Sequence, residues 1–80
     1  MISKKIMLAT INDVKTFVNE VSKYDFDVDL VSGRYAVDAK SIMGIFSLDL
    51  SKVIEMQIHG DDNDSKVKDF INATDKFMVE

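Results

Sequence analysis

Few side chains in this chain could carry covalent chemistry. There is one histidine, His59, and no cysteine, and Ser41 has the most distinctive setting among the serines. Ser41 precedes an apolar run, so its side chain can accept a hydrogen bond from the backbone N–H two or three residues later as a helix N-cap. A phosphate on the same hydroxyl would be stabilised locally, because a helix N-terminus favours negative charge, so the hydroxyl is also a candidate phosphoacceptor. Both interpretations of Ser41 stay open.

The helix predicted after Ser41 is apolar around much of its circumference. At about 100° per residue, its apolar side chains spread over about 220°, whereas a helix docked on one core needs a stripe about 100° wide. We therefore expect part of this surface to be exposed and available to a protein partner. The predicted partner-binding patch is Ile42, Met43 and Phe46, while Ile45 and Leu48 turn to the core.

His59 and an acidic loop are the other candidate sites. His59 alternates with Ile58 along a predicted strand, which places it on the solvent face, and the nearby Asp61 and Asp62 would repel a phosphate. We interpret it as an exposed residue at a strand end. The acidic run 61–64 offers oxygen atoms to a hard cation, but it lacks the twelve-residue loop and bidentate glutamate of an EF-hand. It is interpreted as a solvated turn and helix cap, so no metal or cofactor is predicted.

Composition narrows the classes of function. Eighty residues with a formal net charge of −4 predict a single domain, residues 1–80, and argue against nucleic acid or an anionic membrane as partner. The apolar run in residues 1–9 is too short for a signal sequence or a membrane span, so we expect a cytoplasmic protein. Catalytic Ser/His/Asp spacing and a glycine-rich phosphate loop are both missing from the sequence, and we expect no enzymatic activity.

Apolar spacing predicts three helices. The first covers about residues 13–23 after Asn12 as cap, the second follows Ser41, and the third covers about residues 64–78. Strands are predicted where apolar residues alternate with polar ones. Their apolar positions are Ile6 and Leu8; Phe26, Val28 and Leu30; Tyr35, Val37 and Ala39; and Ile54, Met56 and Ile58.

The resulting order is β-α-β-β-α-β-α, with a turn at Ser32-Gly33. Asp27 and Asp29 alternate with apolar residues, which fits only a sheet with one face in water. Helices must cover the other face. We therefore predict an α+β fold, an open-faced two-layer sandwich in which three helices cover one face of a four-stranded antiparallel sheet.

Lys40-Ser41-Ile42-Met43-Gly44, at this place in this element order, resembles HPr, the small phosphocarrier of the bacterial phosphotransferase system. The resemblance runs from Phe17 through Leu48 and, by apolar spacing, into the last helix. It implies the HPr fold, with a regulatory serine at Ser41 and a hydrophobic docking patch on the helix that follows.

One segment departs from the HPr pattern. HPr proteins carry their phosphoryl group on a histidine in a Gly-x-His-(Ala/Thr)-Arg-Pro-Ala motif, whereas residues 9–15 read Ala-Thr-Ile-Asn-Asp-Val-Lys. Asp13 places negative charge where the phosphoryl group would lie, and Lys15 cannot replace the nucleophile. The resemblance then implies a regulatory or protein-binding module whose partners are phosphotransferase-system components, a serine kinase or a transcriptional regulator. The alternative is a phosphocarrier that uses a non-standard acceptor, for which His59 is the only candidate.

Overall fold

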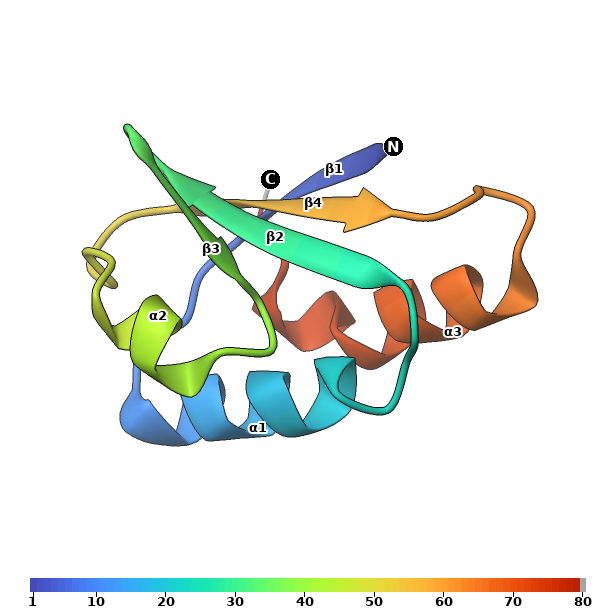
Figure 1. Cartoon of the computed structure of the whole chain (residues 1–80). Coiled ribbons are helices and arrows are strands. Elements are labelled where there is room, and N and C mark those ends of the chain that lie inside the picture. The colour runs from blue at the N-terminus through green and yellow to red at the C-terminus, as the bar shows by residue number, and fades with distance from the viewer. Residues whose placement is uncertain (80) are drawn as a thin grey trace.

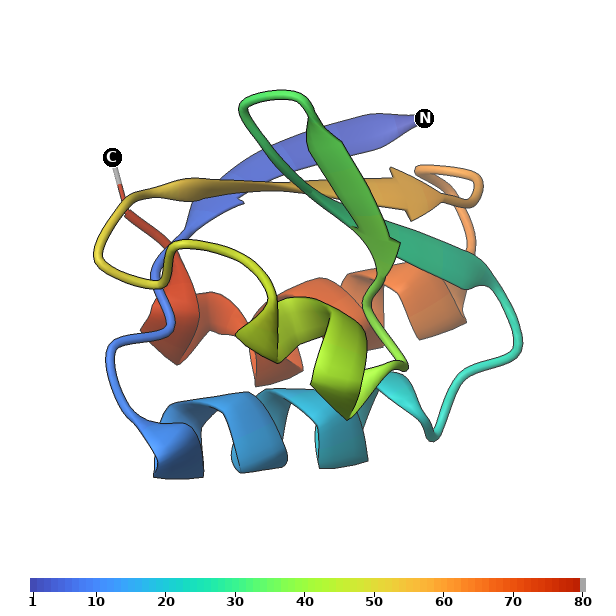
Figure 2. The same cartoon turned by 60° about the vertical axis from the view of Figure 1, so that its left-hand side comes forward.

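Four strands form one antiparallel sheet, and the helices cover one of its faces (Figures 1 and 2). The computed structural model describes residues 1–79. In chain order the elements are β1 (Ile2–Ile6), α1 (Ile11–Val21), β2 (Asp27–Ser32), β3 (Tyr35–Asp38), α2 (Ile42–Phe46), β4 (Ile54–His59), α3 (Ser65–Ala73) and the 3-10 helix η1 (Asp75–Phe77). The sheet order is β1-β4-β2-β3. The predicted fold class is confirmed, and no helix among residues 1–79 is long and apolar enough to span a membrane.

The core lies between the sheet and the helices. In β4 the alternation is strict, since Ile54, Met56 and Ile58 are buried while Glu55 and His59 are exposed on the other face. Aromatic rings from the helices complete this core. The Phe17 ring lies 6.3 Å from that of Phe70 and 6.0 Å from that of Phe77, measured between centroids.

The first helix begins earlier than predicted. Thr10, not Asn12, is the N-cap of α1, and the helix covers Ile11–Val21 instead of residues 13–23. The Thr10 side chain accepts a hydrogen bond from the Asp13 backbone N–H (3.0 Å), and the Asp13 carboxylate accepts one from Thr10 N–H (3.2 Å). This reciprocal capping box satisfies two backbone donors at once, which a lone Asn12 cap would not do.

The chain ends also differ from the predicted elements. β1 stops at Ile6, and the fully buried Leu8 lies in the connection to α1. The last helix, predicted over residues 64–78, ends at Ala73. Thr74 is buried there, and its hydroxyl donates to the carbonyl of Phe70 (2.9 Å). Beyond η1 the chain runs along β1, where Val79 N–H donates to the carbonyl of Lys5 (2.9 Å), and a continuing α-helix could not make that contact.

A tight hairpin joins β2 to β3. Ser32 is paired with Tyr35, which leaves two residues in the turn, and Gly33 has a φ of 61°. A positive φ at the first position of a two-residue hairpin turn favours glycine. The Ser32-Gly33 turn is therefore confirmed.

Candidate functional site

Ser41 caps α2, as predicted. Its side-chain oxygen accepts a hydrogen bond from the backbone N–H of Gly44 (3.1 Å), and its own N–H donates to the carbonyl of Asp38 at the end of β3 (3.0 Å). The residue is exposed to solvent. The hydroxyl therefore stands at the surface, at the first turn of the helix, where added negative charge is favourable.

Gly44 lets the helix approach β3 closely. A Cβ atom at this position would lie 3.2 Å from the Ser41 hydroxyl oxygen and 3.3 Å from the Val37 Cβ. Both distances are shorter than ordinary van der Waals contact. The glycine thus keeps the space around the Ser41 side chain open.

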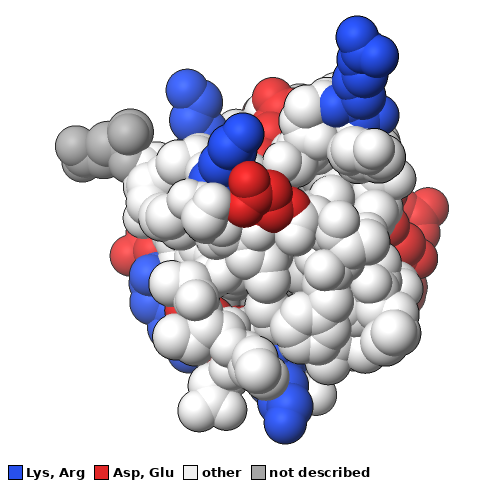
Figure 3. Space-filling view, turned by 90° about the vertical axis from the view of Figure 1, so that its left-hand side faces the viewer, with Lys and Arg blue, Asp and Glu red and all other residues white. Residues whose placement is uncertain are grey.

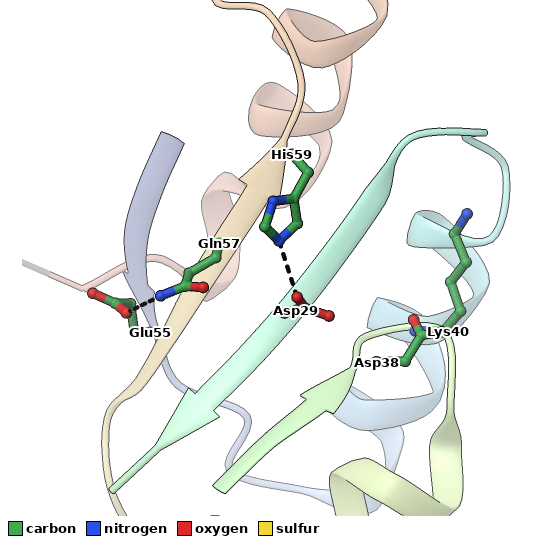
Figure 4. Close-up of polar contacts among 6 residues, drawn as sticks. All are labelled: Asp29, Asp38, Lys40, Glu55, Gln57 and His59. Carbon is green, nitrogen blue, oxygen red and sulfur yellow. Dashed lines mark hydrogen bonds and ion pairs between the residues drawn. The ribbon is translucent and has the colours of Figure 1, made fainter. Parts of the chain in front are cut away.

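The lysine next to Ser41 is turned away from it. Lys40 Nζ donates to the backbone carbonyl of Tyr24 beyond the end of α1 (2.8 Å), and its N–H donates to the Asp38 carboxylate (2.9 Å). Figure 4 draws the Lys40 and Asp38 side chains. The first contact joins the β3–α2 turn to the end of α1, and the second lies within the turn. The ammonium group of Lys40 therefore binds a backbone carbonyl and not the Ser41 hydroxyl.

The exposure of the α2 patch, Ile42, Met43 and Phe46, agrees with the expectation from the apolar spread. Met43 is 76% exposed and Phe46 39%, whereas Ile45 is fully buried. Ile42 is half-buried and packs against the core. Figure 3 views the side on which α2 and the start of α1 lie, and uncharged residues fill most of the centre of this face.

The sequence reasoning missed Ile11, the first residue of α1, which is 62% exposed. Its spacing of three from Val14 would place it on the buried stripe. It is exposed because it stands at the very end of the helix. Since α2 lies beside α1 in both ribbon views, Ile11 adds an apolar side chain at the start of the neighbouring helix.

The Asp13 carboxylate binds backbone N–H groups at the start of α1. Asp13 Oδ2 accepts hydrogen bonds from the N–H groups of Ala9 (3.0 Å) and Thr10 (3.2 Å). Backbone N–H groups at a helix start are the usual ligands of a bound anion. In this chain the Asp13 carboxylate already accepts from two N–H groups just before the helix, those of Ala9 and Thr10.

Residues 12–75 match the family model described as the PTS HPr component phosphorylation site. The chain belongs to this HPr family. Among solved structures, HPr-C-His from Thermoanaerobacter tengcongensis is 26% identical, with 95% of this chain and 93% of that chain covered and a TM-score of 0.74. The catabolite repression protein Crh of Bacillus subtilis is 24% identical, with coverage of 96% and 88% and a TM-score of 0.62. HPr from Bacillus anthracis is 22% identical, with coverage of 90% and 94% and a TM-score of 0.66.

His59 lies on the opposite side of this HPr fold from the helices. It ends β4 on the open face of the sheet, where its Nε2 is 2.9 Å from Asp29 Oδ2 (Figure 4). Asp27 and Asp38 line the same surface depression. The sequence placed His59 on the solvent face but did not identify Asp29, because this pair depends on the β2–β4 register between residues thirty positions apart.

The acidic loop after β4 is ordered by hydrogen bonds to its own backbone. The Asp61 carboxylate accepts from Asn63 N–H (2.9 Å), and Asp64 caps α3 by accepting from Lys66 N–H (2.9 Å). Within residues 1–79 no group of three side chains is arranged to hold a metal ion. The hydrogen bonds of Asp61 and Asp64 make the loop a turn and a helix cap.

Proposed function

We propose that this HPr-family chain is a regulatory, protein-binding module that acts through α2, with Ser41 as phosphoacceptor, and that it carries no phosphohistidine. The observation that supports this most is that the exposed Ser41 hydroxyl caps the same short helix that carries the exposed side chains of Met43 and Phe46. A phosphate on Ser41 would add about two negative charges beside this apolar surface and so alter docking on it.

The start of α1 supports the second half of the proposal. Residues 9–15 contain no histidine, and the backbone N–H groups of Ala9 and Thr10 are bonded to Asp13. A phosphohistidine needs both the imidazole nucleophile and donors for the phosphoryl oxygens. Neither the nucleophile nor the two N–H donors are available there. We further propose that the protein is not an enzyme and that it works in the cytoplasm with phosphotransferase-system components, a serine kinase or a transcriptional regulator.

Incubation with an HPr serine kinase and ATP, followed by intact-mass and peptide mass spectrometry, tests the role of Ser41. The expected result is one phosphoryl group on Ser41, absent in Ser41→Ala and retained in Ser47→Ala, which alters an exposed serine just past α2. Phosphate on another residue, or none, would overturn the assignment of Ser41 and leave the docking patch to be tested alone.

The same kinase tests the patch. Met43→Ser and Phe46→Ser leave the Ser41 hydroxyl in place, so a slower reaction reports docking. Loss of a central apolar contact is expected to lower kcat/KM by at least about tenfold. Lys68→Ser is the control, because Lys68 is an exposed residue on α3, outside the α2 patch. Equal rates for all three variants and the unmodified protein would contradict docking on α2.

A further inference from the structure

A groove lies next to α2, between the β2–β3 turn and the segment that joins α2 to β4. It has a volume of about 470 Å³. Residues 32–35 form one side, and residues 47–49 with 52–53 form the other. Phe46, the last residue of the α2 patch, directly precedes this second side. The groove therefore begins where the patch ends.

The groove is cationic although the chain as a whole is acidic. Arg34 and Lys52 line it against the single carboxylate of Asp49, whereas the net charge of the chain is −4. Within residues 1–79 no carboxylate oxygen lies within 4.0 Å of Arg34. Its guanidinium group is thus available to an incoming anion.

The Asp49 carboxylate neutralises only part of the positive charge of Arg34 and Lys52. Its Oδ1 accepts hydrogen bonds from the N–H (3.0 Å) and the hydroxyl (2.6 Å) of Ser51. Lys52 Nζ lies 3.9 Å from Asp49 Oδ2, and both side chains are more than half exposed. An ion pair of this length and exposure contributes little, so Lys52 can turn to another carboxylate at small cost.

Apolar side chains lie beside the cations in the groove. Tyr35 is 71% exposed and Val53 48%, and Leu48 also lines the groove. A bare anion such as inorganic phosphate would make no use of these surfaces. A ligand that carries carboxylates next to apolar side chains would use both parts of the lining.

We propose that this groove binds an extended acidic peptide segment, whose carboxylates pair with Arg34 and Lys52 and whose apolar neighbours pack on Tyr35 and Val53. Arginine holds a carboxylate through two parallel N–H···O hydrogen bonds, which gives direction as well as attraction. The site goes beyond the proposed docking on α2, and it requires neither phosphate on Ser41 nor a phosphohistidine.

Titration of the ¹⁵N-labelled chain with short capped peptides tests this site. The probes are Leu-Glu-Glu-Leu, its Leu-Gln-Gln-Leu counterpart and inorganic phosphate. The glutamate peptide is expected to give saturable amide shifts at residues 33–35 and 52–53, with binding at least about tenfold tighter than that of the glutamine peptide. Equal binding of the two peptides, or the same shifts with phosphate alone, would overturn the proposal.

Variants separate the groove from general charge and from the patch. Arg34→Gln and Lys52→Gln should each weaken binding of the glutamate peptide, while Lys68→Gln, an exposed lysine on α3, should not. All three positions are exposed, so thermal unfolding is expected to be nearly unchanged. Phe46→Ser should leave peptide binding intact, which keeps failure of the groove distinct from failure of the α2 patch. If Lys68→Gln weakened binding of the glutamate peptide equally, binding would depend only on net charge, and this result would contradict a specific site in the groove.

Discussion

Asp13 and Thr10 exchange hydrogen bonds across the first turn of α1: Asp13 N–H donates to Thr10 Oγ1 at 3.0 Å, and Thr10 N–H donates to Asp13 Oδ2 at 3.2 Å. The same carboxylate oxygen accepts from Ala9 N–H at 3.0 Å. Two backbone N–H groups at the entry to α1 are thereby bonded within the chain and are not free for an external anion. The capping box that fixes the start of α1 therefore also supports the proposed loss of phosphocarrier activity.

Asp13→Ala should destabilise the protein by about 1 kcal/mol, because it removes one half of the capping box. Urea unfolding followed by circular dichroism measures the change. Asp62→Ala is the matched control, since Asp62 is an exposed loop carboxylate outside the helices and should change stability little. Equal effects of the two variants would mean that the Thr10–Asp13 box does not stabilise α1.

Ser41→Ala should cost about 1 kcal/mol, and Ser41→Gly only a few tenths, because glycine is tolerated at an N-cap while alanine is not. The hydrogen bond at stake is the one from Gly44 N–H at 3.1 Å. The free energy of unfolding of the two variants gives the comparison. An equal loss for both substitutions, or none for Ser41→Ala, would contradict the role of this side chain as a cap.

Gly44→Ala should fail to give the stabilisation of about 1 kcal/mol that alanine usually brings over glycine inside a helix. The new Cβ would press on Ser41 Oγ at 3.2 Å and on Val37 Cβ at 3.3 Å. Gly60→Ala should be worse, since its Cβ would lie 2.7 Å from Val67 Cγ2. Thermal unfolding of both variants measures the order, and a stabilised Gly44→Ala would show that α2 is not held tightly against β3.

The pKa of Asp49 is held below its usual range, first by the hydrogen bond from the Ser51 hydroxyl and then by that from the Ser51 N–H. A folded-state pKa below the unfolded value gives stability that is present above the unfolded pKa and is lost as pH falls through the folded pKa. Ser51→Ala should raise the pKa toward the ordinary value, as measured by ¹³C NMR of the carboxyl group. Ser3→Ala is the control, and an unchanged Asp49 pKa in Ser51→Ala would contradict this cause.

Local sequence patterns were sufficient to predict the fold class and the main features of α2. Ser41 before an apolar run predicted both the cap and the exposure of Met43 and Phe46, since each depends on residues within one or two helical turns. The start of α1 was misplaced because two caps compete within three residues. Thr10 is the N-cap because its side chain and that of Asp13 each accept a hydrogen bond from the other residue's backbone N–H. This pair of hydrogen bonds stabilises the helix start more than a single cap residue would.

Contacts between distant segments could not be predicted from the sequence. The pair of Asp29 and His59 requires the register of β2 against β4. Lys40 reaches the carbonyl of Tyr24 across sixteen residues. The end of α3 is also a tertiary effect, because the residues after Thr74 leave the helix to pair with β1. The same is true of the groove, which forms only when the β2–β3 turn stands over the α2–β4 segment.

Incubation with phosphoenolpyruvate and the general phosphotransferase enzyme, followed by intact-mass spectrometry under neutral and acidic conditions, tests the central claim most directly. A phosphohistidine is labile in acid, whereas a phosphoserine is not. The proposed binding module should gain no acid-labile phosphoryl group, while an HPr with its histidine, treated alongside, becomes labelled. An acid-labile phosphoryl group on this chain that disappears in His59→Ala would contradict the account and establish a carrier with a non-standard acceptor.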